Sequence, residues 1–388
     1  MKVDGIVNMQ FDPEAGLRLP PTGGVHRDLR LDICRGMALW FVFIDHVPNN
    51  IISWLTLRNY GFSDATEVFV FISGYTCMIA YGGVLKSQGW LAMSLHAVRR
   101  SWQIYTAFLL LLVVYLAFVQ SFDHASYLDE TNAAVFFAHP GPAILHAGLM
   151  QYRLVNTDIL PLFVLLHLAF PAWLWLFTRS INVALAVSIL LYVSVQIFGI
   201  NLRAWPQGEW YFNPLAWQML FVFGAWYAMD ESAPIRKVAR SSIALTVSVS
   251  YLMLSLIVVL SWHVDGLDKI LPQTLSNWIY PIDKSNLSPV RLLHFFALAC
   301  VAGRLMPRSW RGPSSPLATG LIRCGENSLT IFCLSVLLSL IGYVVIENTS
   351  GTVLMQTLIS MVGIAVMVAI ATLLTWAAKL DGSKPRLF

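Results

Sequence analysis

The chain has 388 residues, of which 57% are hydrophobic and only 12% are charged. Because soluble proteins carry about 25% charged residues, this composition argues against a soluble or nucleic-acid-binding protein and predicts an all-α, polytopic membrane protein. The net charge is only +4, so the placement of the charges is more informative than their sum.

The two ends of the chain differ in character from the long stretch between them. The first 27 residues contain neither a long apolar run nor a cleavage site, so we expect residues 1–29 to form a cytoplasmic tail and not a signal peptide. We expect residues 30–380 to form a single transmembrane domain and residues 381–388 to form a second short cytoplasmic tail.

About ten apolar segments approach the length of about 20 residues that a membrane-spanning helix needs. In chain order they are 34–56, 66–85, 101–120, 158–178, 181–199, 213–230, 242–262, 289–306, 327–346 and 353–377. Arginine and lysine concentrate in alternate connections, such as those with Arg99 and Arg236, and these connections are predicted to lie inside. Both termini are then cytoplasmic, and the connections at 121–157, 200–212 and 263–288 lie outside.

The first apolar segment carries an arginine and a histidine eleven residues apart, Arg35 and His46. This spacing places both on one helix face, about 16 Å apart along the axis. Pro48 is expected to kink the helix beside Asn49 and Asn50. Because a titratable group within a membrane is costly and usually functional, we predict that His46 is a general base, with either asparagine donating to the developing oxyanion. A structural, hydrogen-bonded histidine at a proline kink is the alternative.

Acidic and amide side chains near the expected outer ends of the helices are candidates to assist His46. Asp158 is preferred over Asp45 as the acid that orients the imidazole, because Asp45 lies about 100° around the same helix. Capping of a helix is the alternative for Asp158. Glu67 and Asn213 are expected at the outer mouth, where an acceptor would bind, although Glu67 also suits the capping of a helix N-terminus.

Three arginines at the expected inner face suit a phosphorylated ligand. Arg35, Arg99 and Arg100 are predicted to bind the phosphates of a cytosolic donor, because the planar guanidinium group binds phosphate through two parallel hydrogen bonds. The alternative is that Arg99 and Arg100 only anchor a helix end at the inner surface.

Two further patterns concern structure more than chemistry. Ser73 and Gly74 give the second segment a small face that favours close packing of helices. The five cysteines are scattered and show neither a CxxC pair nor a Cys/His metal spacing. We therefore expect no metal site and no disulfide framework.

The chain resembles the acyltransferase family 3 membrane enzymes, and more closely their OpgC branch, the glucan O-succinyltransferases of Gram-negative bacteria. The resemblance rests on an ordered set of blocks between roughly residues 30 and 335: LDICRGMALWFVFIDH, TLRNYGFSDATEVFVFISGY, RRSWQIY, DILPLF, FNPLAWQ and GENSLTIFCLS. His46 matches the family's essential histidine, Arg35 its motif arginine, and Arg99 with Arg100 its basic pair. DILPLF stands where many members of the wider family carry a tryptophan-containing motif, so acceptor chemistry does not transfer from the wider family.

The resemblance implies a multi-pass inner-membrane O-acyltransferase surrounded by lipid, with no tightly bound cofactor. We predict that it transfers succinyl from cytoplasmic succinyl-CoA to hydroxyl groups of periplasmic glucan. One alternative is an O-acetyltransferase acting on another cell-envelope polysaccharide. Others are a proton-coupled transporter, in which His46 and Asp45 relay protons, and a scaffold subunit of glucan synthesis. The identity of the acyl group, a covalent acyl-enzyme and a homodimer are left open by the sequence.

Overall fold

The computed structural model describes residues 28–121, 125–264, 279–306, 315–349 and 351–380. The predicted tails at 1–29 and 381–388 therefore lie outside the described residues, apart from Asp28 and Leu29. The described residues form helices and no β-strand, which confirms the all-α prediction.

The helices follow one another with short connections. Their bounds are α1 Leu29–His46, α2 Ala65–Gln120, α3 Ala125–Glu130, α4 Ala133–Ala138, α5 Pro140–Gly148, α6 Ile159–Arg179, α7 Ile181–Phe198, α8 Pro214–Tyr227, α9 Ala233–Ala239, α10 Ser242–Leu260, α12 Pro289–Leu305, α13 Pro316–Glu326, α14 Ser328–Glu347 and α15 Val353–Leu380. Three 3₁₀ helices occur in the connections: η1 Ile51–Leu55, η2 Leu57–Asn59 and η3 Asp230–Ser232.

Among the described residues, six helices are long and apolar enough to cross a membrane, namely α2, α6, α7, α10, α14 and α15. This finding supports a membrane protein, while the count of ten spans and the side of each terminus stay predictions. The first predicted span, 34–56, is wrong at its C-terminal end. Helix α1 ends at His46, two residues before Pro48, and Val47 is extended with φ −81° and ψ 110°. The residue before a proline is driven out of the helical region by steric clash, so the helix stops where a kink was predicted.

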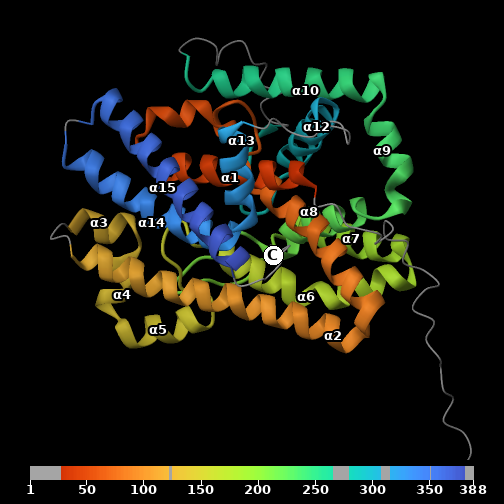
Figure 1. Ribbon diagram of the computed structural model, residues 1–388, viewed down its shortest axis with the longest axis horizontal. Coiled ribbons are helices and arrows are strands. Elements are labelled where there is room, and N and C mark those ends of the chain that lie inside the picture. Colours follow the sequence, from red (N-terminus) through yellow and green to blue (C-terminus); the bar gives the residue numbers. More distant parts are fainter. Residues whose placement is uncertain (1–27, 122–124, 265–278, 307–314, 350, 381–388) are drawn as a thin grey trace, which may run out of the picture.

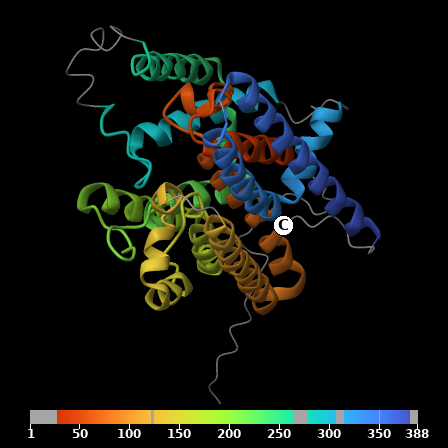
Figure 2. The same cartoon turned by 90° about the vertical axis from the view of Figure 1, so that its left-hand side faces the viewer.

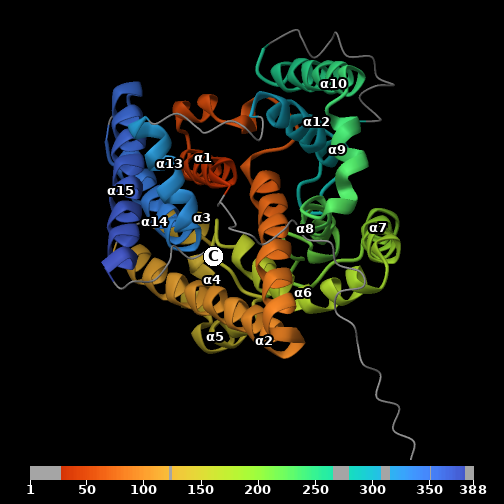
Figure 3. The same ribbon diagram turned by 45° about the vertical axis from the view of Figure 1, so that its right-hand side comes forward.

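Helix α2 joins two segments that the sequence presents as separate spans, 66–85 and 101–120. Gly89 lies between them with φ 83° and ψ −177°, a conformation that glycine adopts without the steric penalty of a Cβ. We call residues 65–88 the first arm and residues 90–120 the second arm. In Figure 3 the first arm runs vertically and the second arm runs away from it along the bottom of the molecule.

The first arm packs closely against α8 through paired glycines. A Cβ on Gly74 would lie 1.8 Å from the carbonyl oxygen of Phe221, and a Cβ on Gly224 would lie 2.1 Å from that of Phe71. Neither helix can carry a larger residue here without separating from the other. This contact confirms that Gly74 belongs to a face for close helix packing.

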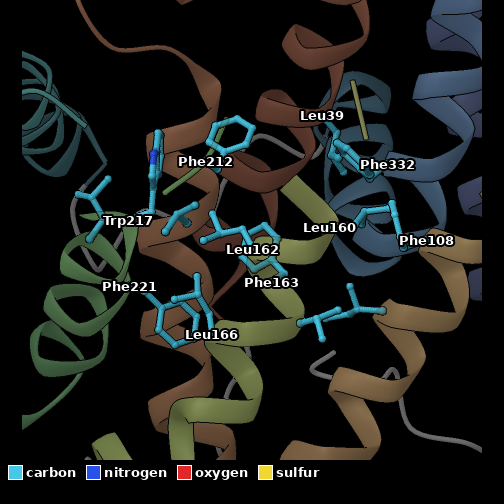
Figure 4. Close-up of a cluster of buried hydrophobic side chains, with 14 of the residues drawn as sticks. Leu39, Phe108, Leu160, Leu162, Phe163, Leu166, Phe212, Trp217, Phe221 and Phe332 are labelled. Atoms are coloured by element: carbon cyan, nitrogen blue, oxygen red, sulfur yellow. The ribbon is translucent and has the colours of Figure 1, made fainter. Parts of the chain in front are cut away.

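The arrangement separates the connections that the charge pattern assigns to opposite sides. The bend of α2 and helix α9, both in connections predicted inside, lie on the right of Figure 1, whereas α3, in a connection predicted outside, lies on the left. Helix α10 packs along α12 at one edge of the molecule (Figure 2). The core between α1, α2, α6, α8 and α14 is filled by large apolar side chains, among them Leu39, Phe163, Trp217, Phe221 and Phe332 (Figure 4).

Candidate active site

His46 is the last residue of α1 and lies beside charged groups from distant parts of the chain. Its Nδ1 atom is buried and has no hydrogen-bond partner among the described residues. The charges that act electrostatically on the imidazole are those of Lys284, Asp64 and Arg58. His46 therefore keeps one ring nitrogen available to a ligand, within the field of both cations and an anion.

Four charged residues form a network, which we call the charge cluster: Asp64, Glu67, Lys284 and Arg291. The Lys284 ammonium lies 2.6 Å from Oδ2 of Asp64, and Nη2 of Arg291 lies 2.6 Å from Oε1 of Glu67 and 3.3 Å from Oδ2 of Asp64. Glu67 is fully buried. Because each acid pairs with a cation, the cluster holds the start of α2 against α12 and the 281–288 segment.

The two acids of the cluster also cap the first arm of α2. Oδ1 of Asp64 accepts from the Thr66 backbone N–H at 2.8 Å, and Oε2 of Glu67 accepts from the Asp64 backbone N–H at 2.9 Å. This reciprocal pair is a capping box, as the alternative reading of Glu67 predicts. Glu67 thus uses one oxygen for the cap and the other for Arg291, and its predicted contact with an acceptor stays a prediction.

The charges of the cluster stabilise one another. Burial opposes ionisation of Asp64, but the neighbouring Lys284 and Arg291 outweigh it and lower the pKa of this carboxyl. Burial likewise disfavours the charged form of Lys284, and the negative charges of Asp64 and Glu67 more than offset it, so the pKa of the ammonium is raised. Both groups are therefore charged near neutral pH.

Asn213 holds the segment that carries Lys284. It is fully buried at the start of α8, where its side chain accepts from the Leu215 N–H at 3.1 Å and donates to Oδ1 of Asn286 at 2.8 Å. Its backbone N–H donates to the carbonyl of Ser285 at 3.0 Å. The observed contacts of Asn213 thus position a loop, and a contact with an acceptor stays a prediction.

The polar residues that flank His46 in sequence mainly contact the turn after α1. Oδ1 of Asp45 accepts from the Thr56 hydroxyl at 2.6 Å. Asn50 is buried, caps η1 by accepting from Ile52, and donates to Oγ of Ser360 in α15 at 3.0 Å. Asn49 is exposed, with a φ of 56°. Of the two asparagines, Asn49 is the one that faces outward.

Asp158 forms an ion pair away from the charge cluster. Its Oδ1 accepts from Nε of Arg153 at 2.9 Å, and the Arg153 guanidinium lies over the ring of Trp210 at 4.9 Å from the centroid. Asp158 precedes α6 but makes no side-chain cap hydrogen bond to it. The carboxylate is engaged by Arg153, and the orientation of His46 by Asp158 stays a prediction.

A small cavity lies between α1, both arms of α2, α6 and α14, and we call it the arginine pocket. Its volume is about 40 Å³. The polar groups in its wall are Arg35, Ser73, Arg100, His167 and Ser328. The remaining wall is apolar, with Phe69, Ile104, Ile159, Leu160, Phe163, Leu329 and Phe332. The bend at Gly89 brings the second arm, with Arg100, to the same cavity as the first.

The basic residues predicted to act together are divided by the structure. Arg35 is buried and donates a hydrogen bond to the Thr76 hydroxyl, and Arg100 is half-buried and donates to Gln103 at 3.3 Å. Arg99 is exposed and does not line the pocket. Arg35 and Arg100 therefore meet in one enclosed space, whereas Arg99 faces outward.

Three residues at these sites were not predicted. His167 lines the arginine pocket, with Nδ1 2.9 Å from the carbonyl of Phe163, and Lys284 and Arg291 belong to the charge cluster. His167 lies mid-way along an apolar segment and Arg291 near the start of another, and a polar residue inside such a segment is itself a sign of function. Lys284 gives no comparable signal, because it stands in a connection.

Comparison with known proteins gives one match over most of the chain. A family model described as OpgC protein matches residues 27–379. No curated protein and no solved structure matches the chain. The matched range contains α1 with Arg35 and His46, the charge cluster and the arginine pocket.

Proposed function

The chain belongs to the OpgC protein family, which suggests an acyltransferase, and we propose that it transfers succinyl from cytoplasmic succinyl-CoA to hydroxyl groups of periplasmic glucan. The family match across residues 27–379 is the observation that carries this proposal, because it covers both residues of the Arg35–His46 pair. The protein would act as a multi-pass enzyme of the inner membrane. The apolar helices support the membrane part of this proposal.

The proposed reaction uses His46 as general base. The imidazole takes the proton of a sugar hydroxyl while the hydroxyl oxygen attacks the thioester carbonyl. The carbon–sulfur bond then breaks, and the departing CoA thiolate takes the proton back from the imidazolium. The buried, unoccupied Nδ1 of His46 supports this role, since a base must present a nitrogen with no other partner.

The surroundings of His46 divide the remaining tasks. The Lys284 ammonium and the outward-facing Asn49 are candidates to stabilise the negative charge that develops on the thioester oxygen. Asp45 and Asp158 are each engaged by another side chain in the described structure. Either would orient the imidazole only after exchanging Thr56 or Arg153 for His46. Arg35 and Arg100 would hold the donor from the other end of α1.

Mass spectrometry of periplasmic glucans tests the proposal directly. Glucans from a deletion strain should lack the succinyl mass increment, and a plasmid with the wild-type chain should restore it. His46→Gln should not restore it, provided that the variant is present in the membrane at the wild-type level. Full succinylation with His46→Gln would remove the histidine from the mechanism.

The same spectra separate the proposal from the other functions. An acetyl increment in place of succinyl would identify an O-acetyltransferase. Unchanged acylation together with a changed amount of glucan in the deletion strain would indicate a scaffold subunit of glucan synthesis.

A further inference from the structure

The arginine pocket brings two guanidinium groups to one small space. Arg35 is only 6% exposed and comes from α1, and Arg100 comes from the second arm of α2. Guanidinium groups bind carboxylate and phosphate oxygens through paired, charge-assisted hydrogen bonds. The hydroxyls of Ser73 and Ser328 in the same wall add further donors for such oxygens. The chemistry of the wall therefore suits a small oxyanion.

The size of the pocket limits what that oxyanion can be attached to. Its volume of about 40 Å³ is that of about three water molecules. A carboxylate or a single phosphate group fits this space, whereas a phosphate that carries the ribose and adenine of CoA does not. The apolar part of the wall, which includes Phe69, Phe163 and Ile104, suits a short hydrocarbon chain. A carboxylate at the end of a two-carbon chain matches both parts.

The position of the pocket relates it to His46. Arg35 precedes His46 by about three turns on the same face of α1. On α2, Phe69 and Ser73 of the pocket wall follow Glu67 of the charge cluster within about two turns. Two helices thus place the pocket next to the catalytic end of α1, on the side from which a cytoplasmic donor is predicted to arrive.

We propose that the arginine pocket selects the acyl group by binding the terminal carboxylate of a dicarboxylic acyl donor between Arg35 and Arg100. This inference rests on the proposed acyl transfer and names the part of the donor that the pocket recognises. The exposed Arg99 remains available to the phosphates of the donor. An acyl group without a terminal carboxylate forgoes the charge-assisted hydrogen bonds and binds more weakly.

Equilibrium binding to the full chain in lipid nanodiscs tests this assignment, with succinyl-CoA, acetyl-CoA and succinyl-pantetheine as probes. The wild type should bind succinyl-CoA roughly ten- to hundredfold more tightly than acetyl-CoA, the range for hydrogen bonds to charged groups. Arg100→Gln should bring this ratio close to one and leave acetyl-CoA affinity unchanged. Arg99→Gln should weaken both CoA donors by a similar factor and keep the ratio.

Two further variants make the test specific. Lys86→Gln removes an exposed cation from the same helix and should leave both affinities unchanged. Ser73→Val retains both arginines but fills part of the pocket, so it should also reduce the preference for succinyl-CoA. It serves as a second probe if Arg100→Gln does not fold.

The outcomes separate the carboxylate from the phosphates. Equal wild-type affinity for succinyl-CoA and acetyl-CoA would overturn the proposal. So would an Arg100→Gln variant that weakens both CoA donors alike and spares succinyl-pantetheine, because the pocket would then bind a phosphate. Binding is measured without glucan, so a preserved succinyl preference supports the pocket even if the glucan spectra show no succinyl transfer.

Discussion

Removal of Arg291 is expected to destabilise the protein by leaving the acids of the charge cluster without their shared cation. Arg291→Met keeps an unbranched side chain but deletes the guanidinium that lies 2.6 Å from Oε1 of the fully buried Glu67. Breaking a buried ion pair by removing one partner costs about 3–5 kcal/mol. Because Lys284 still pairs with Asp64 at 2.6 Å, the expected loss is at the lower end, about 3 kcal/mol.

A double-mutant cycle isolates this interaction from other effects of the substitutions. The unfolding free energies of the wild type, Arg291→Met, Glu67→Gln and the double variant would be measured by denaturation of the purified protein in one detergent. The double variant should be more stable than the sum of the two single losses predicts, because it buries no unpaired charge. A loss below about 1 kcal/mol for Arg291→Met, or strictly additive losses, would refute the reasoning.

Three further predictions concern packing, chemistry and pH. Gly74→Ala should cost about 1–3 kcal/mol in thermal unfolding, because its Cβ would lie 1.8 Å from the Phe221 carbonyl, whereas Gly83→Ala on the same helix meets nothing within 4 Å and should not destabilise; equal losses would contradict the close contact. His46→Gln should lower glucan-dependent release of CoA thiol by at least about 100-fold at an unchanged unfolding temperature, and wild-type turnover would argue against a general base. The lowered pKa of Asp64 means that its stabilisation is present above the unfolded pKa, about 4, and is lost as the pH falls through the folded pKa. The stability gap between wild type and Asp64→Asn should therefore be constant from about pH 5 to 8 and shrink in more acidic solution; a gap that widens in acid would oppose this sign.

The helices were largely predictable because hydrophobic segments and caps are local properties of a sequence. The capping box of α2 is such a case, since Asp64 and Glu67 lie within one helical turn. The two errors arise where a single residue overrides the pattern. Pro48 ends α1 through its effect on Val47, and Gly89 turns the chain without any polar loop to mark the place.

The candidate site was predictable only where its residues lie on one helix. The spacing of Arg35 and His46 follows from the helical repeat. The division between Arg99 and Arg100 does not, because it depends on how the second arm is rotated against α6 and α1. The pairing of Glu67 with Arg291 joins residues that are 224 positions apart, and no local pattern encodes such a contact.

The sharp bend at Gly89 also fixes a register between the two arms of α2. A surface loop tolerates inserted residues, since the elements on either side keep their positions. At this elbow, one residue inserted between positions 90 and 99 would rotate the rest of the second arm by about 100°. Arg100 would then turn away from Arg35, although every helix and every charge were still present. The eleven residues from Gly89 to Arg100 thus measure out an angle, as the eleven residues from Arg35 to His46 measure out a distance.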